Sequence, residues 1–132
     1  MKKFVTCMKK YATFSGRATR SEYWLFYLWA IIFSVIPTIL GSISMGLGNE
    51  ANLSLLKGLG VLLMILSYLI SLALFLPSFA VCVRRLHDIG KSGTYILFGL
   101  IPLVGSIILL IFACTDSQKG TNQYGISEKY PS

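Results

Sequence analysis

Residues that could bind an anion or titrate gather in one short polar segment, residues 84–93. It contains Arg84, Arg85, His87 and Asp88, and His87 is the only histidine of the chain. Adjacent guanidinium groups can hold a phosphate through paired hydrogen bonds, and a histidine beside a carboxylate can titrate near neutral pH. Anchoring and turn formation at a helix end explain the same residue types. The segment therefore predicts either a binding site or a structural stop.

The spacing within this segment predicts how the preceding helix ends. Arg84 and Asp88 would form an i, i+4 ion pair if that helix extends through them. Gly90 suits the left-handed residue that terminates a helix.

A second charged group, Arg17, Arg20 and Glu22, precedes the first apolar stretch. Thr19 and Glu22 have the spacing of a capping box, in which each side chain accepts a hydrogen bond from the backbone N–H of the other residue. This pattern predicts that a helix begins here, with two arginines at its start.

The composition indicates what must position these groups. Of the 132 residues, 55% are hydrophobic and 13% are charged, against roughly 25% charged residues in a typical soluble domain. This excludes a disordered chain, and three cysteines do not make a disulfide-rich secreted module. We expect one all-α membrane domain over residues 1–132.

Three long stretches of the chain lack any charged residue, and each exceeds the roughly 20 residues that cross a bilayer as a helix. They predict three transmembrane helices over residues 22–45, 58–83 and 94–115, followed by a polar tail over 116–132. Pro102 removes a backbone hydrogen bond near the middle of the third stretch. The third helix is therefore expected to be kinked or broken there.

Residues 1–14 predict an amphipathic helix lying in the membrane interface. On a helical wheel, four lysines fall on one half and the apolar side chains on the other. The apolar run between the two lysine pairs has five residues, which is too short for a cleaved signal peptide. A basic leader that only sets topology is the alternative.

Basic residues also predict the orientation. Six of them precede the first span and three lie in the 84–93 loop, whereas the loop between the first two spans has Lys57 alone. The positive-inside rule then puts the N-terminus and the 84–93 loop in the cytoplasm, and three full spans would put the tail outside. A re-entrant hairpin around residues 101–105 would instead keep the tail inside. The full span is preferred because irregular backbone at membrane depth must be shielded by protein.

Three blocks of the sequence resemble the signature blocks of a known family. They are residues 14–24, residues 84–93 with the Arg-Arg-Leu-His-Asp run, and residues 116–125 with Asp116, Asn122, Tyr124 and Gly125. The chain is similar in these blocks to the domain-of-unknown-function 805 family of small bacterial inner-membrane proteins. The resemblance implies a fold and a location in the inner membrane, and it makes the tail block a candidate polar motif, but the family has no established activity.

Other chemistry is not predicted. Cys7, Cys82 and Cys114 lack metal-ligand spacing, so no metal or cofactor is expected, and no catalytic constellation points to an enzyme. The positive charge has a sufficient cause in topology, so nucleic acid is not an expected partner. Small residues in the first two spans favour close helix packing, within the chain or in a homo-oligomer: Gly41, Ser42, Ser44, Ser67 and Ser71.

Two functions remain as hypotheses. The preferred one is a non-enzymatic membrane interaction protein, whose cationic cytoplasmic collar engages anionic lipid headgroups or a partner membrane protein. The alternative is a lipid-active or transport component that works as an oligomer. The candidate residues are Arg17, Arg20, Glu22, Arg84, Arg85, His87 and Asp88, of which Glu22, His87 and Asp88 would titrate under the alternative.

Overall fold

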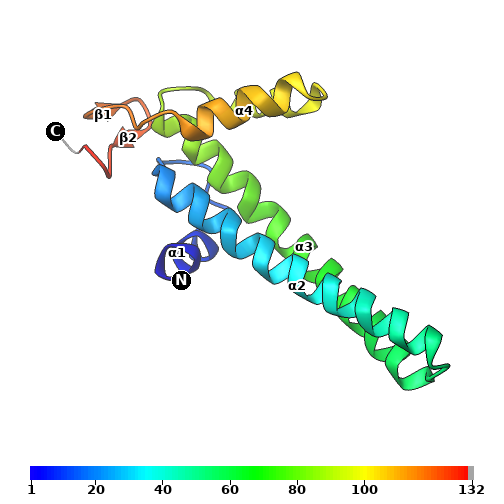
Figure 1. Ribbon diagram of the computed structural model, residues 1–132. Coiled ribbons are helices and arrows are strands. Elements are labelled where there is room, and N and C mark those ends of the chain that lie inside the picture. The colour runs from blue at the N-terminus through cyan, green and yellow to red at the C-terminus, as the bar shows by residue number, and fades with distance from the viewer. Residues whose placement is uncertain (131–132) are drawn as a thin grey trace. The chain divides into compact units, whose positions relative to one another are not determined.

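A computed structural model describes residues 1–130 and is mainly helical (Figure 1). Its elements in chain order are α1 (Lys2–Lys9), α2 (Arg20–Glu50), α3 (Ser54–Asp88), the 3-10 helix η1 (Gly93–Leu100), α4 (Val104–Cys114) and the strands β1 (Thr121–Asn122) and β2 (Gly125–Ile126). They form two compact units. We call Leu28–Phe75 the arm, and the remainder, residues 1–27 together with the chain from residue 76 onward, the head.

The two long helices, α2 and α3, correspond to the first two predicted spans. They have 31 and 35 residues, so at 1.5 Å per residue each exceeds the roughly 30 Å of a hydrocarbon core. Both are long and apolar enough to cross a membrane. The predicted ranges 22–45 and 58–83 lie inside these helices, which extend two to five residues beyond each predicted end.

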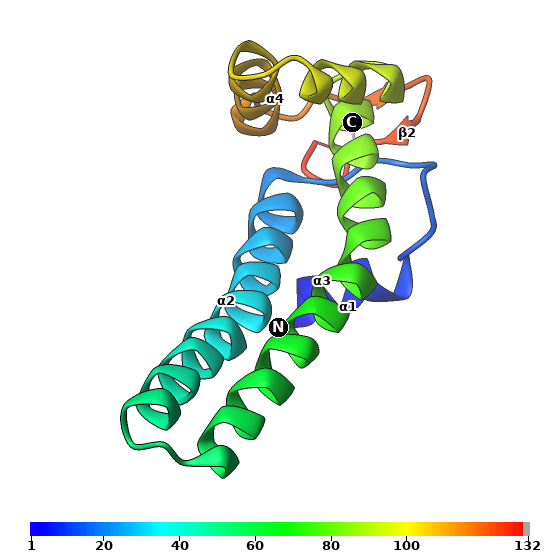
Figure 2. The ribbon, with the colours of Figure 1, turned by 90° about the vertical axis from the view of Figure 1, so that its right-hand side faces the viewer.

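In the arm, α2 and α3 run antiparallel beside each other (Figures 1 and 2). Small residues permit this approach, because a Cβ on Gly60 would lie 2.7 Å from the carbonyl oxygen of Gly41. The Ser67 hydroxyl lies 2.6 Å from that of Thr38 and donates to the Ser34 carbonyl, while Ser44 donates to the Leu56 carbonyl across the same pair. These contacts satisfy polar groups inside the chain.

The third apolar stretch, predicted as a helix over 94–115 that is kinked or broken at Pro102, is broken there. It forms η1 and α4, which are separated by residues 101–103 and pack against each other. Pro102 lacks an N–H and disfavours a helical residue before it, and Leu103 has a φ of +63°. Gly105 sits so close to the Phe98 carbonyl that any Cβ there would collide with it.

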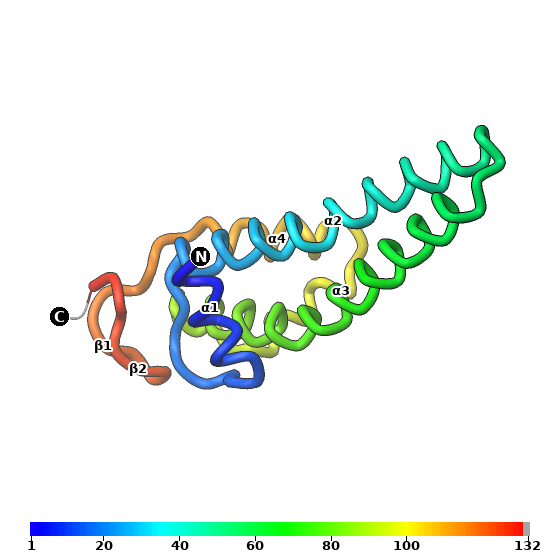
Figure 3. Tube along the Cα trace, turned by 90° about the horizontal axis from the view of Figure 1, so that it is seen from below, coloured from blue at the N-terminus to red at the C-terminus, as the bar shows by residue number. Residues whose placement is uncertain are grey.

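The N-terminal helix, α1, is shorter than the predicted 1–14, because the chain leaves the helix after Lys9. Its Cys7 is buried, and the Phe4 ring stacks on the Phe26 ring of α2 with centroids 5.5 Å apart. The tube in Figure 3 shows α1 beside the beginning of α2. The position of α1 in a membrane interface stays a prediction.

The tail, residues 115–130, is not purely irregular. β1 and β2 pair as an antiparallel hairpin with Thr121 opposite Ile126 and Asn122 opposite Gly125. This small sheet was not predicted, because two-residue strands leave no periodic signal in a sequence.

Candidate functional site: a buried ion cluster in the head

The ends of α2 and α3 bring the two predicted charged groups together. The Thr19 hydroxyl accepts a hydrogen bond from the Glu22 N–H at 3.2 Å, which confirms one half of the predicted capping box. Gly90 has a φ of +77°, and the N–H of Lys91 donates to the Leu86 carbonyl at 2.8 Å. This is the pattern of a Schellman motif, so the predicted stop at Gly90 is confirmed.

Asp88 is the centre of the cluster and is completely buried. One carboxylate oxygen accepts from Arg17 Nε at 2.9 Å, and the other accepts from Arg85 and from the Ser117 hydroxyl. Its carbonyl also accepts from the Gln118 N–H at 2.9 Å. Asp88 thereby joins the N-terminal segment, α3 and the tail.

Arg17 connects Asp88 to the backbone of the tail. In addition to the carboxylate bond, its guanidinium donates to the carbonyls of Asp88 at 3.0 Å, Gly120 at 2.9 Å and Gly125 at 3.3 Å, and to that of Gln118. Five hydrogen bonds match the five N–H donors of a guanidinium. Arg17 is therefore saturated by the protein.

Arg85 has a similar role on the other side of Asp88. It donates to the carbonyls of Ala18 at 3.1 Å and Ala113 at 3.4 Å, and to that of Thr115. Arg85 thus holds the start of α2 and the end of α4 against α3.

Arg84 forms a separate pair, because its Nη1 lies 2.7 Å from the Glu22 carboxylate. Cys7 of α1 donates to the same carboxylate oxygen at 3.2 Å, and the Arg84 carbonyl accepts from the Ala18 N–H. Within residues 1–130, the Nε and Nη2 atoms of Arg84 have no hydrogen-bond partner although they are buried. The predicted Arg84–Asp88 pair is wrong, because Glu22 and Arg17 provide closer partners from other segments.

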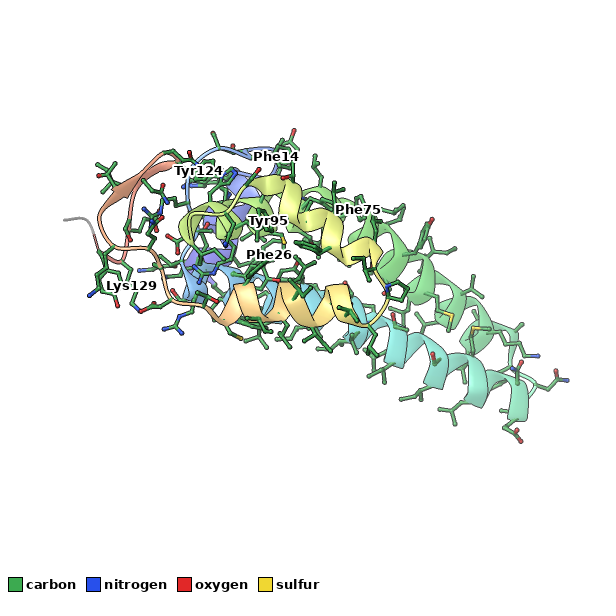
Figure 4. All side chains as sticks on the ribbon, turned by 90° about the horizontal axis from the view of Figure 1, so that it is seen from above. Phe14, Phe26, Phe75, Tyr95, Tyr124 and Lys129 are labelled. Atoms are coloured by element: carbon green, nitrogen blue, oxygen red, sulfur yellow. The ribbon has the colours of Figure 1, made fainter. Side chains whose placement is uncertain are left out.

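His87 and Tyr124 fasten the tail hairpin to α3. Their rings are parallel within 2° with centroids 3.8 Å apart, and His87 Nδ1 donates to the Gly16 carbonyl at 3.1 Å. Asn122 donates to the His87 carbonyl at 2.9 Å and accepts from the Tyr124 N–H. Tyr124 is labelled on the tail in Figure 4.

Two predicted site residues lie outside this buried cluster. Arg20 is exposed, donates to the Cys114 carbonyl at 3.1 Å and lies 3.3 Å from the exposed Asp116. Asp116 also accepts from Lys129 at 2.6 Å and from the Tyr130 hydroxyl at 2.9 Å. Lys129 lowers the pKa of the Asp116 carboxyl well below its usual range, with Tyr130 as the second cause.

Sequence reasoning missed the part played by the tail backbone. The carbonyls of Gln118, Gly120 and Gly125 accept from Arg17. Every residue has a backbone carbonyl, so the sequence does not show which carbonyls act as acceptors. Cys7 was not among the predicted site residues, whereas its thiol donates to Glu22. The resemblance of the tail block to a family motif was the available signal for the tail.

Charge divides unequally between the two units. The head holds eleven basic and four acidic residues, which gives it the entire net charge of +7, while the arm has Lys57 and Glu50. The buried cluster uses three arginines and two carboxylates. Eight cations and two acids of the head remain outside it.

The chain matches a known family over most of its length. Residues 11–126 match the family described as "Protein of unknown function (DUF805)". The chain belongs to the DUF805 family. It is 39% identical over 132 residues to "Inner membrane protein YhaI" of Escherichia coli (strain K12), covering 100% of this chain and 99% of the relative. It is 37% identical over 126 residues to "Inner membrane protein YhaH" of the same strain, covering 96% and 95%. No solved structure matches the chain.

The DUF805 match encloses nearly all of the buried cluster. Every cluster residue from Arg17 to Gly125 lies within residues 11–126, whereas α1 with Cys7 precedes them. The three blocks that suggested the family are therefore the segments that meet around Asp88. Together with two apolar helices, membership in the DUF805 family identifies a multi-pass membrane protein.

Proposed function

We propose that this protein is a non-enzymatic component of the bacterial inner membrane that binds anionic lipid headgroups through exposed cations of the head. The observation that carries this proposal is the partition of charge in the head. The cluster arginines are buried and paired, while an excess of cations is left outside the cluster. Anionic leaflets attract such residues by about 1 kcal/mol for each Lys or Arg near the surface.

The cationic collar in this proposal does not consist of the same residues as the one that we predicted from the sequence. Arg17, Arg84 and Arg85 are at most 5% exposed, and each is paired with Asp88 or Glu22, so they do not belong to an exposed collar. The collar consists instead of cations outside the cluster: Lys2, Lys3, Lys9, Lys10, Arg20, Lys91, Lys119 and Lys129.

The bonds between the head arginines and the tail support a topology with both chain ends in the cytoplasm. Arg17 and Arg85 bond to the tail, so the tail shares one side of the membrane with the start of α2 and the end of α3. α4 has 11 residues, about 16 Å, which is half of a hydrocarbon core. We infer that η1 and α4 form a re-entrant hairpin, shielded because the two pack on each other.

The geometry gives less support to a lipid-active or transport role. The carboxylates that would titrate, those of Glu22 and Asp88, are held by arginines, and His87 is stacked on Tyr124. An interaction role needs no further reactive group.

The proposal is tested by measuring which lipids surround the protein. The full chain is reconstituted in bilayers of phosphatidylcholine with a minor fraction of spin-labelled phosphatidylglycerol, and the immobilised fraction of the label is recorded. We expect enrichment of the labelled lipid, which falls with added salt and falls in a variant with Lys2→Gln, Lys9→Gln and Lys10→Gln.

Lys57→Gln is the matched control, because Lys57 belongs to the arm. It should leave the enrichment unchanged if the cations of the head are responsible. Equal enrichment of the lipid around the native chain and the triple variant would overturn the proposal.

A further inference from the structure

An open pocket, which we call the cavity and which is lined by polar and charged residues, lies at the surface of the head beside the first turn of α2. It has a volume of about 380 Å³ and is lined by Lys3 of α1, by Thr19, Arg20 and Ser21, and by Glu128 and Lys129 of the tail. Cavities that hold small ligands begin at roughly 300 Å³. Three segments far apart in the sequence thus form a space large enough for a headgroup. Figure 4 shows Lys129 on the tail.

The lining of the cavity has an excess of positive charge. Lys3, Arg20 and Lys129 contribute three cations, and the lining carries one acid, Glu128. Arg20 and Lys129 share a single carboxylate, that of Asp116. Among the described residues, Lys3 forms no ion pair and donates to the neutral Ser21 hydroxyl. Together with Asp116, the group carries three positive and two negative charges, so one bound anion would neutralise it.

The cations are held in place before any ligand arrives. Arg20 is fixed by the Cys114 carbonyl and by Asp116, which leaves further guanidinium donors. Lys129 is fixed by the same carboxylate at 2.6 Å. The Thr19 and Ser21 hydroxyls lie 3.1 Å apart at the cavity, where the N-terminus of a 31-residue helix also favours negative charge. Such prearrangement reduces the entropy that binding would otherwise cost.

The place of the cavity on α2 indicates what kind of anion it takes. Trp24 lies one turn after Arg20 on the same helix and is 41% exposed. Tryptophan at such a position is typical of the headgroup level of a membrane. A phospholipid would place its phosphate between the cations, at the headgroup level that Trp24 marks.

From these observations we propose that the cavity between α1, the start of α2 and the tail binds one phosphate group, with Lys3, Arg20 and Lys129 as its ligands. This inference deepens the proposed function by naming a single site. The phosphate belongs to an anionic phospholipid headgroup or to free phosphate, since both present the same oxygens to the same donors.

The site is tested with the full chain purified in mild detergent. Native mass spectrometry counts the lipids that remain bound, and the melting temperature is followed during titration with phosphatidylglycerol and, separately, with inorganic phosphate. We expect one retained phospholipid and a saturable rise in melting temperature with phosphatidylglycerol. A rise with inorganic phosphate and no retained lipid would assign the site to free phosphate.

Variants connect the bound phosphate to the cavity. Arg20→Gln and Lys3→Gln should each weaken binding roughly tenfold or more, as expected when a charge-assisted hydrogen bond is lost. Lys119→Gln is the matched control, because Lys119 is a tail cation that does not line the cavity, and it should bind like the native chain. Both altered residues are exposed, and the melting temperature of each variant without ligand shows whether it is folded.

Two results would overturn the site. One is the absence of both retained lipid and thermal shift with either probe, and the other is equal binding by the native chain, Arg20→Gln and Lys3→Gln. Neither result bears on the proposed function, which is tested with Lys2, Lys9 and Lys10, and none of these lines the cavity.

Discussion

Asp88 at the end of α3 accepts a hydrogen bond at 2.9 Å from Arg17, which precedes it by 71 positions. Both side chains are at most 2% exposed. This buried carboxylate bonds to the guanidinium groups of Arg17 and Arg85, and it therefore holds the segments that carry them close together. The head is thus organised around one acid, and this acid is the most informative position to alter.

Asp88→Asn should destabilise the head strongly. It removes the negative charge between Arg17 and Arg85, and leaving a buried ion without its partner costs about 3–5 kcal/mol. The measurement is reversible unfolding of the purified chain in detergent. Asp116→Asn is the control, because Asp116 is exposed, and it should change the free energy of unfolding little. Equal losses in the two variants would refute a central role for Asp88.

Gly60→Ala should weaken the packing of the arm, whereas Gly58→Ala should not. A Cβ on Gly60 would lie 2.4 Å from Met45 Cγ and 2.7 Å from the Gly41 carbonyl oxygen, while one on Gly58 would meet nothing within 4 Å. Overpacking of this kind costs about 1–3 kcal/mol. The two variants have the same helix and the same substitution, so a difference in melting temperature isolates the helix contact. Indistinguishable melting temperatures would contradict it.

Cys7 should resist maleimide under native conditions. Burial raises the pKa of its thiol to about 12, with the neighbouring Glu22 carboxylate as a further cause, so the reactive thiolate is scarce at pH 7–9. At any pH between 7 and 9, Cys7 should therefore be labelled far more slowly than the exposed Cys114. The test compares single-cysteine chains, one with Cys82→Ser and Cys114→Ser and the other with Cys7→Ser and Cys82→Ser. Rapid native labelling of Cys7 would contradict the burial of its thiol.

Reporter fusions test the inferred topology. A fluorescent protein that is active in the cytoplasm should be bright when fused after the tail, and a periplasm-active phosphatase should be inactive there. The phosphatase fused after Asn52, in the turn between α2 and α3, should be active. An active phosphatase after the tail would mean that the third apolar stretch spans the membrane, and it would separate the tail from the arginines that bind it here.

The sequence predicted features that depend on local spacing. The lengths of apolar stretches located α2 and α3, Thr19 located the start of α2, and Gly90 located the end of α3. Each of these depends on neighbouring residues alone, so a linear pattern can encode it. Pro102 also indicated the right position for the break in the third stretch.

What the sequence did not predict depends on partners that are distant along the chain. Nothing near Arg84 shows that Glu22, 62 positions away, competes with Asp88 for its guanidinium. The contacts between η1 and α4, which form after the break at Pro102, were also not predicted from the sequence. Likewise, positive charge identified the arginines as candidates, but charge alone does not distinguish a surface collar from a buried cluster.

The bonds from Arg17 to the carbonyls of Gly120 and Gly125 have a consequence for biogenesis. During synthesis Arg17 leaves the ribosome first, and its acceptors follow more than a hundred residues later. Both long helices are therefore made, and are available for insertion, before the head can close. Insertion of the helices and closure of the head are consequently successive steps. A nascent chain that stops before the tail would have both long helices, while the arginines of the head would lack their acceptors and stay accessible to quality-control factors.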